Sequence, residues 1–176
     1  MALIRDGSLP IISIAPFLNN QPRGAVLRAE TAAALHKACV EYGFFYLDIS
    51  AYVDALVPET LVELAREFFA LPQEEKDKLA LANQDHARGA WLVFIHHDLA
   101  CNNHRILAGY ARLKQNVTNG KADNHEGLDL YKPVVNPDKT KPLWGENQWP
   151  TVPGFREKYE DWVEKMKALG MIVMHA

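Results

Sequence analysis

The spacing of apolar residues predicts three long amphipathic helices. Apolar side chains recur at intervals close to 3.6 residues over residues 23–42, over residues 59–71 and from about residue 153 to the end of the chain. Pro58 suits the first turn of the second helix, and Pro72 ends it. A short helix is expected to restart at once, over residues 73–79.

Each helix is expected to bury one face. The first helix is expected to end at Gly43. Its predicted buried face consists of Val26, Ala29, Ala33, Leu35, Cys39 and Val40. Cys39 is interpreted there as a small buried hydrophobic residue. In the second helix the buried stripe is predicted to be Leu61, Leu64, Ala65, Phe68 and Phe69. The charged residues Glu74, Glu75, Lys76 and Lys78 are predicted to form a solvated face.

The last helix carries a long apolar stripe, formed by Phe155, Tyr159, Trp162, Val163, Met166, Leu169, Ile172 and Val173. The stripe continues to the end of the chain at Ala176, without a glycine or asparagine cap. We therefore expect this helix, from about residue 153, to be truncated.

Short apolar runs predict strands between these helices, at residues 9–14, 44–47, 110–113 and 128–135. The aromatic run 44–47 is expected to be buried. Residues 116–126 and 136–147 are polar and rich in turn-forming residues, which indicates loops.

Composition narrows the class of protein. Of the 176 residues, 48% are hydrophobic and 23% are charged, which is typical of a folded globular chain. The net charge of −3 gives no basic field for nucleic acid, and no apolar run approaches the ~18 residues of a membrane span. The N-terminus lacks the order of parts of a signal peptide, so a cytoplasmic location is expected. Neither a nucleic-acid partner nor a membrane partner is predicted, and the oligomeric state is left open.

Several separated pieces resemble the N-terminal region of the Fe(II)/2-oxoglutarate-dependent dioxygenases, the family that includes isopenicillin N synthase. In chain order the pieces are LPIISI at 9–14, EYGFFYL at 41–47, FFALPQEEK at 68–76, EGLD at 126–129, and WP at 149–150 followed by PGFR at 153–156. Ser13 stands where the family usually has aspartate. No single piece is decisive, but five in the family's order make the resemblance specific.

The resemblance implies an α+β fold, the N-terminal helical and strand region of a double-stranded β-helix (jelly-roll) oxygenase with most of the barrel missing. It also implies Fe(II) and 2-oxoglutarate as cofactors of the full-length enzyme and a small-molecule substrate. The family's iron ligands, His-x-Asp…His, and its 2-oxoglutarate arginine come after the long helix. This chain ends before reaching them, so no catalytic or metal residue is assigned to it.

One local match to the iron motif is treated as a decoy. His96, His97 and Asp98 form His-x-Asp, and His104 follows six residues after Asp98. The family assembles its ligands from distant strands, and this short segment offers no rigid scaffold for a working site. We interpret these histidines as part of an irregular loop.

An insertion explains the same block. Removing residues 90–109 joins Arg88-Gly89 to Tyr110 and restores the family's "RGY". The block is twenty residues long, a whole number of codons, and it contains five consecutive apolar residues. We hypothesise that 88–110 holds a retained intron or gene-model error; the alternative is a genuine surface loop, which would have to bury that apolar run.

Arg88 and Tyr110 are the candidate substrate-binding residues. The resemblance puts the RGY region near the mouth of the substrate pocket, where an arginine can pair with a substrate carboxylate. The alternative is a surface arginine and a packed tyrosine. His125 beside Glu126 could form an acid–base pair, although a structural hydrogen bond is the favoured interpretation.

The sequence thus predicts the N-terminal portion of an oxidoreductase that hydroxylates, desaturates or cyclises a small organic molecule, inactive as this isolated chain. The alternative is a non-catalytic protein-binding module derived from the same family.

Overall fold

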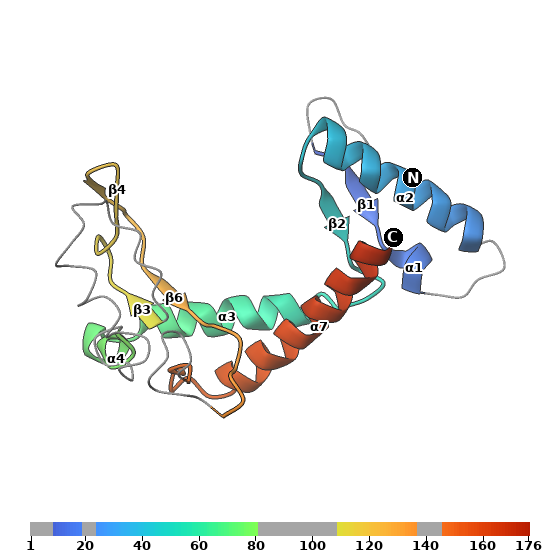
Figure 1. Ribbon diagram of the computed structural model, residues 1–176. Helices are drawn as coiled ribbons and strands as arrows, with labels where there is room; N and C mark the ends of the chain where they lie inside the picture. Colours follow the sequence, from blue (N-terminus) through green and yellow to red (C-terminus); the bar gives the residue numbers. More distant parts are fainter. Residues whose placement is uncertain (1–8, 19–23, 81–108, 137–145) are drawn as a thin grey trace. The chain divides into compact units, whose positions relative to one another are not determined.

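A computed structural model describes residues 9–18, 24–80, 109–136 and 146–176 (Figure 1). The chain divides into two compact units, one of Met1–Glu63 with Glu157–Ala176 and the other of Leu64–Arg156. Two long helices, α3 (Leu56–Ala70) and α7 (Phe155–His175), each contribute residues to both units. No helix in the described part of the chain is long and apolar enough to cross a membrane.

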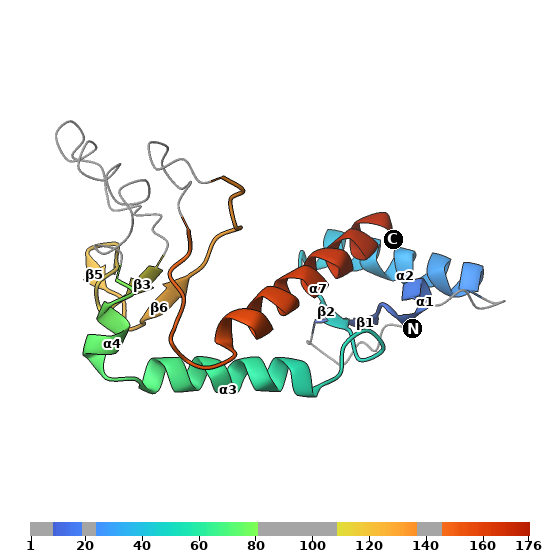
Figure 2. The same cartoon turned by 90° about the horizontal axis from the view of Figure 1, so that it is seen from below.

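The Leu64–Arg156 unit contains the C-terminal part of α3, the short helix α4 (Gln73–Asp77) and four short strands. The strand β3 (Gly109–Ala111) pairs antiparallel with β6 (Gly127–Asp129), so that Tyr110 lies opposite Leu128. Figure 2 shows α4 and these strands gathered at the C-terminal end of α3. Pro72 separates the two helices, as predicted, because its ring removes a backbone donor and fixes φ.

The segment 116–126, predicted as a loop, contains a tight hairpin of β4 (Val117–Thr118) and β5 (Lys121–Ala122). Its turn residues Asn119 and Gly120 have φ of 51° and 76°. This left-handed pair suits a two-residue hairpin, because its twist matches that of the strands.

The strand predicted over 128–135 is shorter than expected. It ends at Asp129, and the side chain of Asn147 then takes the place of a strand partner. The Tyr131 amide donates to Asn147 Oδ1 at 2.9 Å, and Asn147 Nδ2 donates to the Tyr131 carbonyl at 2.6 Å. One amide side chain therefore satisfies both backbone groups of Tyr131.

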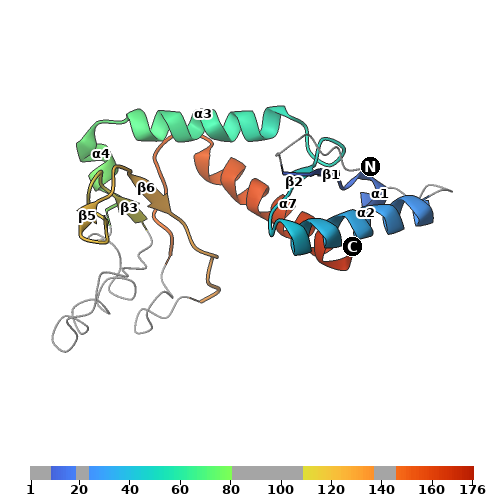
Figure 3. The same cartoon turned by 90° about the horizontal axis from the view of Figure 1, so that it is seen from above.

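The other unit is built on two parallel strands, β1 (Ile11–Ser13) and β2 (Tyr46–Asp48), with Ile12 opposite Leu47. Parallel strands need a long connection, which is supplied by α1 (Ala15–Leu18) and α2 (Gly24–Glu41). Figure 3 shows α2 running beside the strands. The core here consists of Ile12, Leu35 and Ala38, with Ala34, Phe45 and Ala176 packed against it.

The predicted length of α2 is confirmed, but of its predicted buried face only Leu35 is buried. The buried residues are Gly24, Thr31, Leu35 and Ala38, whereas Val26 and Val40 are 64% and 71% exposed. Cys39 is exposed rather than buried. The helix ends at Gly43 as predicted: Gly43 has φ of 71°, and its amide donates to the Ala38 carbonyl at 3.1 Å.

The expected burial of the aromatic run 44–47 is wrong for Phe44 and Tyr46, although Phe45 packs against the core. Phe44 precedes the strand and is 72% exposed, and Tyr46 is 61% exposed. Tyr46 lies opposite Ile11, which is likewise exposed, whereas Ile12 packs on α2. Adjacent strand residues point to opposite faces, so covering one face leaves the other open.

The apolar stripe predicted for α7 is confirmed as its less exposed face, with Phe155 and Leu169 buried. Tyr52 donates its hydroxyl to the Lys165 carbonyl at 3.1 Å. This bond joins the loop after β2 to α7 within one unit.

Candidate functional site

The main polar cluster of the described residues lies where α4 meets the β3–β6 sheet. We call Gln73, Lys76, Tyr110 and Glu126 the Lys76 cluster. Lys76 Nζ donates to Glu126 Oε2 at 2.9 Å, and the Tyr110 hydroxyl donates to the same oxygen at 2.5 Å. Gln73 Nε2 lies 3.2 Å from the Tyr110 hydroxyl. Lys76 and Tyr110 are 7% and 0% exposed, so both polar side chains are held away from water.

The break at Pro72 is what turns Lys76 inward. Because α3 ends at Ala70, its last carbonyls have no partner within the helix. Lys76 Nζ reaches back to the Phe69 carbonyl at 3.1 Å, which places a positive charge at the negative end of the α3 dipole. The prediction that Lys76 belongs to a solvated face is therefore wrong.

The aromatic core directly beneath this cluster is built on Phe68. Its ring makes edge-on contacts with Tyr110, at 6.0 Å between centroids, and with Phe155, at 6.2 Å. Lys76 Nζ lies 5.6 Å from the centre of the Tyr110 ring. The ring of Tyr110 thus packs on the core, while its hydroxyl enters the polar cluster.

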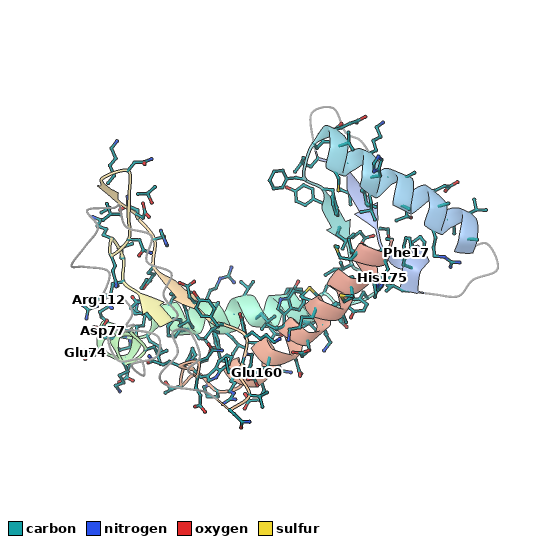
Figure 4. The ribbon with its side chains drawn as sticks, viewed as in Figure 1. Phe17, Glu74, Asp77, Arg112, Glu160 and His175 are labelled. Carbon is teal, nitrogen blue, oxygen red and sulfur yellow. The ribbon has the colours of Figure 1, made fainter. Side chains whose placement is uncertain are left out.

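A second ion pair flanks the Lys76 cluster on its solvent side. Arg112 donates from Nε and from Nη2 to the two carboxylate oxygens of Asp77, both at 2.7 Å. Figure 4 labels both residues beside α4. Asp77 also accepts from Gln73, so the two ion pairs share one network. The Gln73 hydrogen bond, together with Arg112, holds the pKa of Asp77 below its ordinary value.

The charges of the Lys76 cluster stabilise one another. The Tyr110 hydrogen bond, followed by Lys76, lowers the pKa of Glu126, and the Glu126 carboxylate raises the pKa of Lys76. Burial, and then the Glu126 carboxylate, raise the pKa of Tyr110. Across neutral pH the cluster therefore holds one carboxylate, one ammonium and one neutral phenol.

These shifts predict loss of stability at both ends of the pH scale. The depressed pKa of Glu126 stabilises the fold above its ordinary value of 4.5, and this contribution is lost as pH falls through the folded-state value. The raised pKa values of Lys76 and Tyr110 stabilise the fold below 10.5 and 10.0, and that contribution is lost as pH rises beyond them.

Urea midpoints measured from pH 2.5 to 11 should show both losses, and Glu126→Gln should weaken the dependence at the acid end. If the urea midpoint of that variant fell as steeply at acid pH as that of the wild type, Glu126 would not be the group responsible.

The sequence-predicted residues are only partly brought together. Tyr110 lies in the Lys76 cluster, while Arg88 and the histidines of the decoy motif lie outside the described residues. His125 is exposed, and the Glu126 carboxylate contacts Lys76 and Tyr110 instead. In the described ranges no three His, Cys, Asp or Glu side chains gather closely enough to hold a metal ion.

Within each unit, short pieces singled out in the sequence contact one another. LPIISI and EYGFFYL supply the paired strands β1 and β2 of one unit. In the other unit, FFALPQEEK supplies Phe68 and Lys76, EGLD supplies Glu126, and PGFR supplies Phe155. The pieces therefore mark packing and ion-pair contacts between distant segments.

Comparison with known proteins gives a consistent result. The sequence profile of the N-terminal region of non-haem dioxygenases in morphine synthesis matches residues 9–98. The chain is 33% identical to homoarginine-6-hydroxylase 2-ODD-C23 of Glycine max, over 95% of this chain and 46% of that protein. It is 31% identical to the 2-oxoglutarate-dependent dioxygenase frbJ of Dothideomycetidae sp. (strain 11243), over 90% of this chain and 37% of that protein.

Among solved structures, a full-length Neurospora crassa protein in complex with alpha-KG and 5-formyluracil aligns with a TM-score of 0.65 and 19% identity. The alignment covers 99% of this chain and 45% of the Neurospora protein. The chain thus spans less than half the length of each of these proteins.

Proposed function

The chain belongs to the Fe(II)/2-oxoglutarate-dependent dioxygenase family, and on this premise we propose that it is the N-terminal portion of an oxidoreductase acting on a small organic molecule. The predicted fold class is confirmed: the chain has the α+β fold of the N-terminal region of 2-oxoglutarate- and Fe(II)-dependent oxygenases. The observation that supports the proposal most is the meeting of the sequence pieces at β1–β2 and at the Lys76 cluster.

In the proposed enzyme this chain supports the catalytic part and does not hold the cofactors. Its described residues gather no metal-binding cluster, and the iron and 2-oxoglutarate ligands are proposed to lie outside these 176 residues. When bound, Fe(II) and 2-oxoglutarate would supply oxidation by O₂, with release of succinate and CO₂. The hydroxylation, desaturation or cyclisation of the substrate would take place in a pocket of which this chain would form one wall.

Arg88 and Tyr110 are proposed to serve the substrate side of that wall. Arg88 would pair with a carboxylate or another acidic group of the substrate. Tyr110, which is buried and donates its hydroxyl to Glu126, would contribute to the wall by fixing the position of β3. A small polar substrate agrees with the name of the homoarginine hydroxylase relative and with the 5-formyluracil in the Neurospora crassa complex.

Succinate release tests the proposal. The 176-residue chain, assayed with Fe(II), 2-oxoglutarate, ascorbate and a panel of small amino acids and pyrimidines, should release no succinate above a no-substrate control. A longer natural form that also contains a His-x-Asp…His segment should release it with at least one substrate. Turnover by the short chain alone would contradict the predicted inactivity, and failure of the longer form on every substrate would contradict the function.

A non-catalytic protein-binding module remains the second candidate. Ile11, Phe44 and Tyr46 expose apolar surface on or beside the β1–β2 sheet, and such surface is a feature of protein interaction sites. A chain that is monomeric, unfolds cooperatively and has no longer natural form would favour this alternative.

Deleting residues 90–109 should leave the Leu64–Arg156 unit intact. The Tyr110 amide donates to the Leu79 carbonyl at 2.9 Å, so the described segments on either side of the removed stretch already lie together. The deletion puts Gly89 at the place of Gly109, whose φ of 115° favours glycine. The urea midpoint of the deleted chain should equal or exceed that of the parent. A collapse of the midpoint would show the block to be a genuine part of the fold.

A further inference from the structure

Lys76 is a buried charge whose partners come from three separate segments. Its ammonium contacts the Phe69 carbonyl at the end of α3, the Tyr110 ring of β3 and the carboxylate of Glu126 just before β6. An apolar side chain would fill the same space without the desolvation cost of a charge. The charge makes the packing specific, because the hydrogen bonds of an ammonium group require acceptors at fixed positions.

Glu126 is where these contacts converge. Its Oε2 atom accepts from both Lys76 and Tyr110, so one oxygen joins α4 to β3. The backbone makes the same junction: the Tyr110 amide donates to the Leu79 carbonyl, and Ala80 forms a parallel bridge with Tyr110. On its other side Tyr110 pairs with Leu128 of β6. The position of Tyr110 is therefore set from two sides at once.

We propose that Glu126 is a positioning residue, which fixes β3 against the end of α4 through Lys76 and Tyr110. The inference deepens the proposed function and rests on it in part, because β3 carries one of the two residues proposed for the substrate side. Glu126 itself contacts no substrate in this scheme. Its carboxylate holds β3, and with it one wall of the substrate pocket, in the position that binds the substrate.

The backbone amide of Tyr110 reports this role directly. In the full chain, Glu126→Gln replaces the anionic acceptor with a neutral one and should speed hydrogen exchange at that amide about tenfold, as expected for one weakened charged hydrogen bond. The matched control is Glu75→Gln on α4, since Glu75 forms an exposed ion pair with Lys78. The control should leave exchange at Tyr110 unchanged, and both variants should leave the Tyr42 amide of the other unit unchanged.

Equal exchange at Tyr110 in wild type and in Glu126→Gln would overturn the proposal, as would an equal rise in the Glu75→Gln control. If Glu126→Gln unfolds the chain, Tyr110→Phe is used as the test variant instead. This variant removes only the hydroxyl that donates a hydrogen bond to Glu126. Tyr110→Phe should then speed exchange at residue 110 locally, and no local change would overturn the proposal.

An enzyme assay separates positioning from stability alone. In a longer active form that contains this chain, Glu126→Gln should raise KM for the organic substrate severalfold, with kcat and KM for 2-oxoglutarate nearly unchanged. The link to the substrate side would be overturned if kcat and both KM values were impaired to the same degree. An unchanged KM for the organic substrate would overturn it as well. If the wild-type form releases no succinate, the proposed function fails, and the exchange experiment still decides whether Glu126 positions β3.

Discussion

Replacing Phe68 with alanine is expected to lower the free energy of unfolding of the Leu64–Arg156 unit by about 3–5 kcal/mol, the usual cost of deleting a buried ring. Phe68 is 1% exposed and contacts the rings of Phe69, Tyr110 and Phe155. These partners come from three elements, so the cavity could close only by moving segments that are separately fixed. Equilibrium urea denaturation followed by near-ultraviolet circular dichroism measures the loss.

The matched control for this prediction is Phe44→Ala. Phe44 is the same residue type but 72% exposed, so its loss should change stability by no more than about 0.5 kcal/mol. Similar losses for the two variants would mean that Phe68 is not the centre of the core.

Replacing Lys76 with methionine should cost about 2–3 kcal/mol. Removing one partner of a fully buried ion pair costs roughly 3–5 kcal/mol, and the figure is reduced here because the Glu126 side chain is 28% exposed. The variant leaves Glu126 without its cation and the Phe69 carbonyl without its donor. Chemical denaturation at pH 7 gives the value.

Two further variants show whether charge is the cause. Adding Glu126→Gln to Lys76→Met should recover part of the loss, because the stranded carboxylate is then gone. Lys78→Met should cost under about 1 kcal/mol, since Lys78 and Glu75 are 64% and 39% exposed. A Lys76→Met loss no larger than that of Lys78→Met would contradict the buried ion pair.

Local signals in the sequence were sufficient for the helix ends. Gly43 and Pro72 act on the backbone alone, through a left-handed φ and a missing amide donor, so no knowledge of the tertiary structure is needed to place them. The apolar stripe of α7 was also predictable, because most of its large apolar side chains lie on one face of the helix.

Burial depended on partners that the local pattern does not contain. Most faces of α2 carry alanine, so the spacing favours no face, and contact with Ile12 of β1 decides which one is buried. Cys39 was assigned to the wrong side for this reason. The exposure of Phe44 likewise follows from α2 covering the sheet on the side of Ile12.

Lys76 shows the same limit for charges. In a run of glutamate and lysine after a proline, a solvated face is the ordinary outcome, and the acceptor that buries this lysine lies fifty residues away at Glu126. A signal was nonetheless present, because Lys76 and Glu126 both fall in pieces singled out for their resemblance to the dioxygenases. Those pieces identified the family correctly without revealing that they touch.

Sequencing the mature transcript from codon 80 to its stop codon is the most direct test that this chain is part of a dioxygenase. We expect the transcript to join Arg88-Gly89 to Tyr110 and to continue past codon 176 into a His-x-Asp…His pattern. A transcript that encodes all 176 residues and then stops would contradict a catalytic role, and the exposed surface around Phe44 and Tyr46 would then be the place to look for a binding partner.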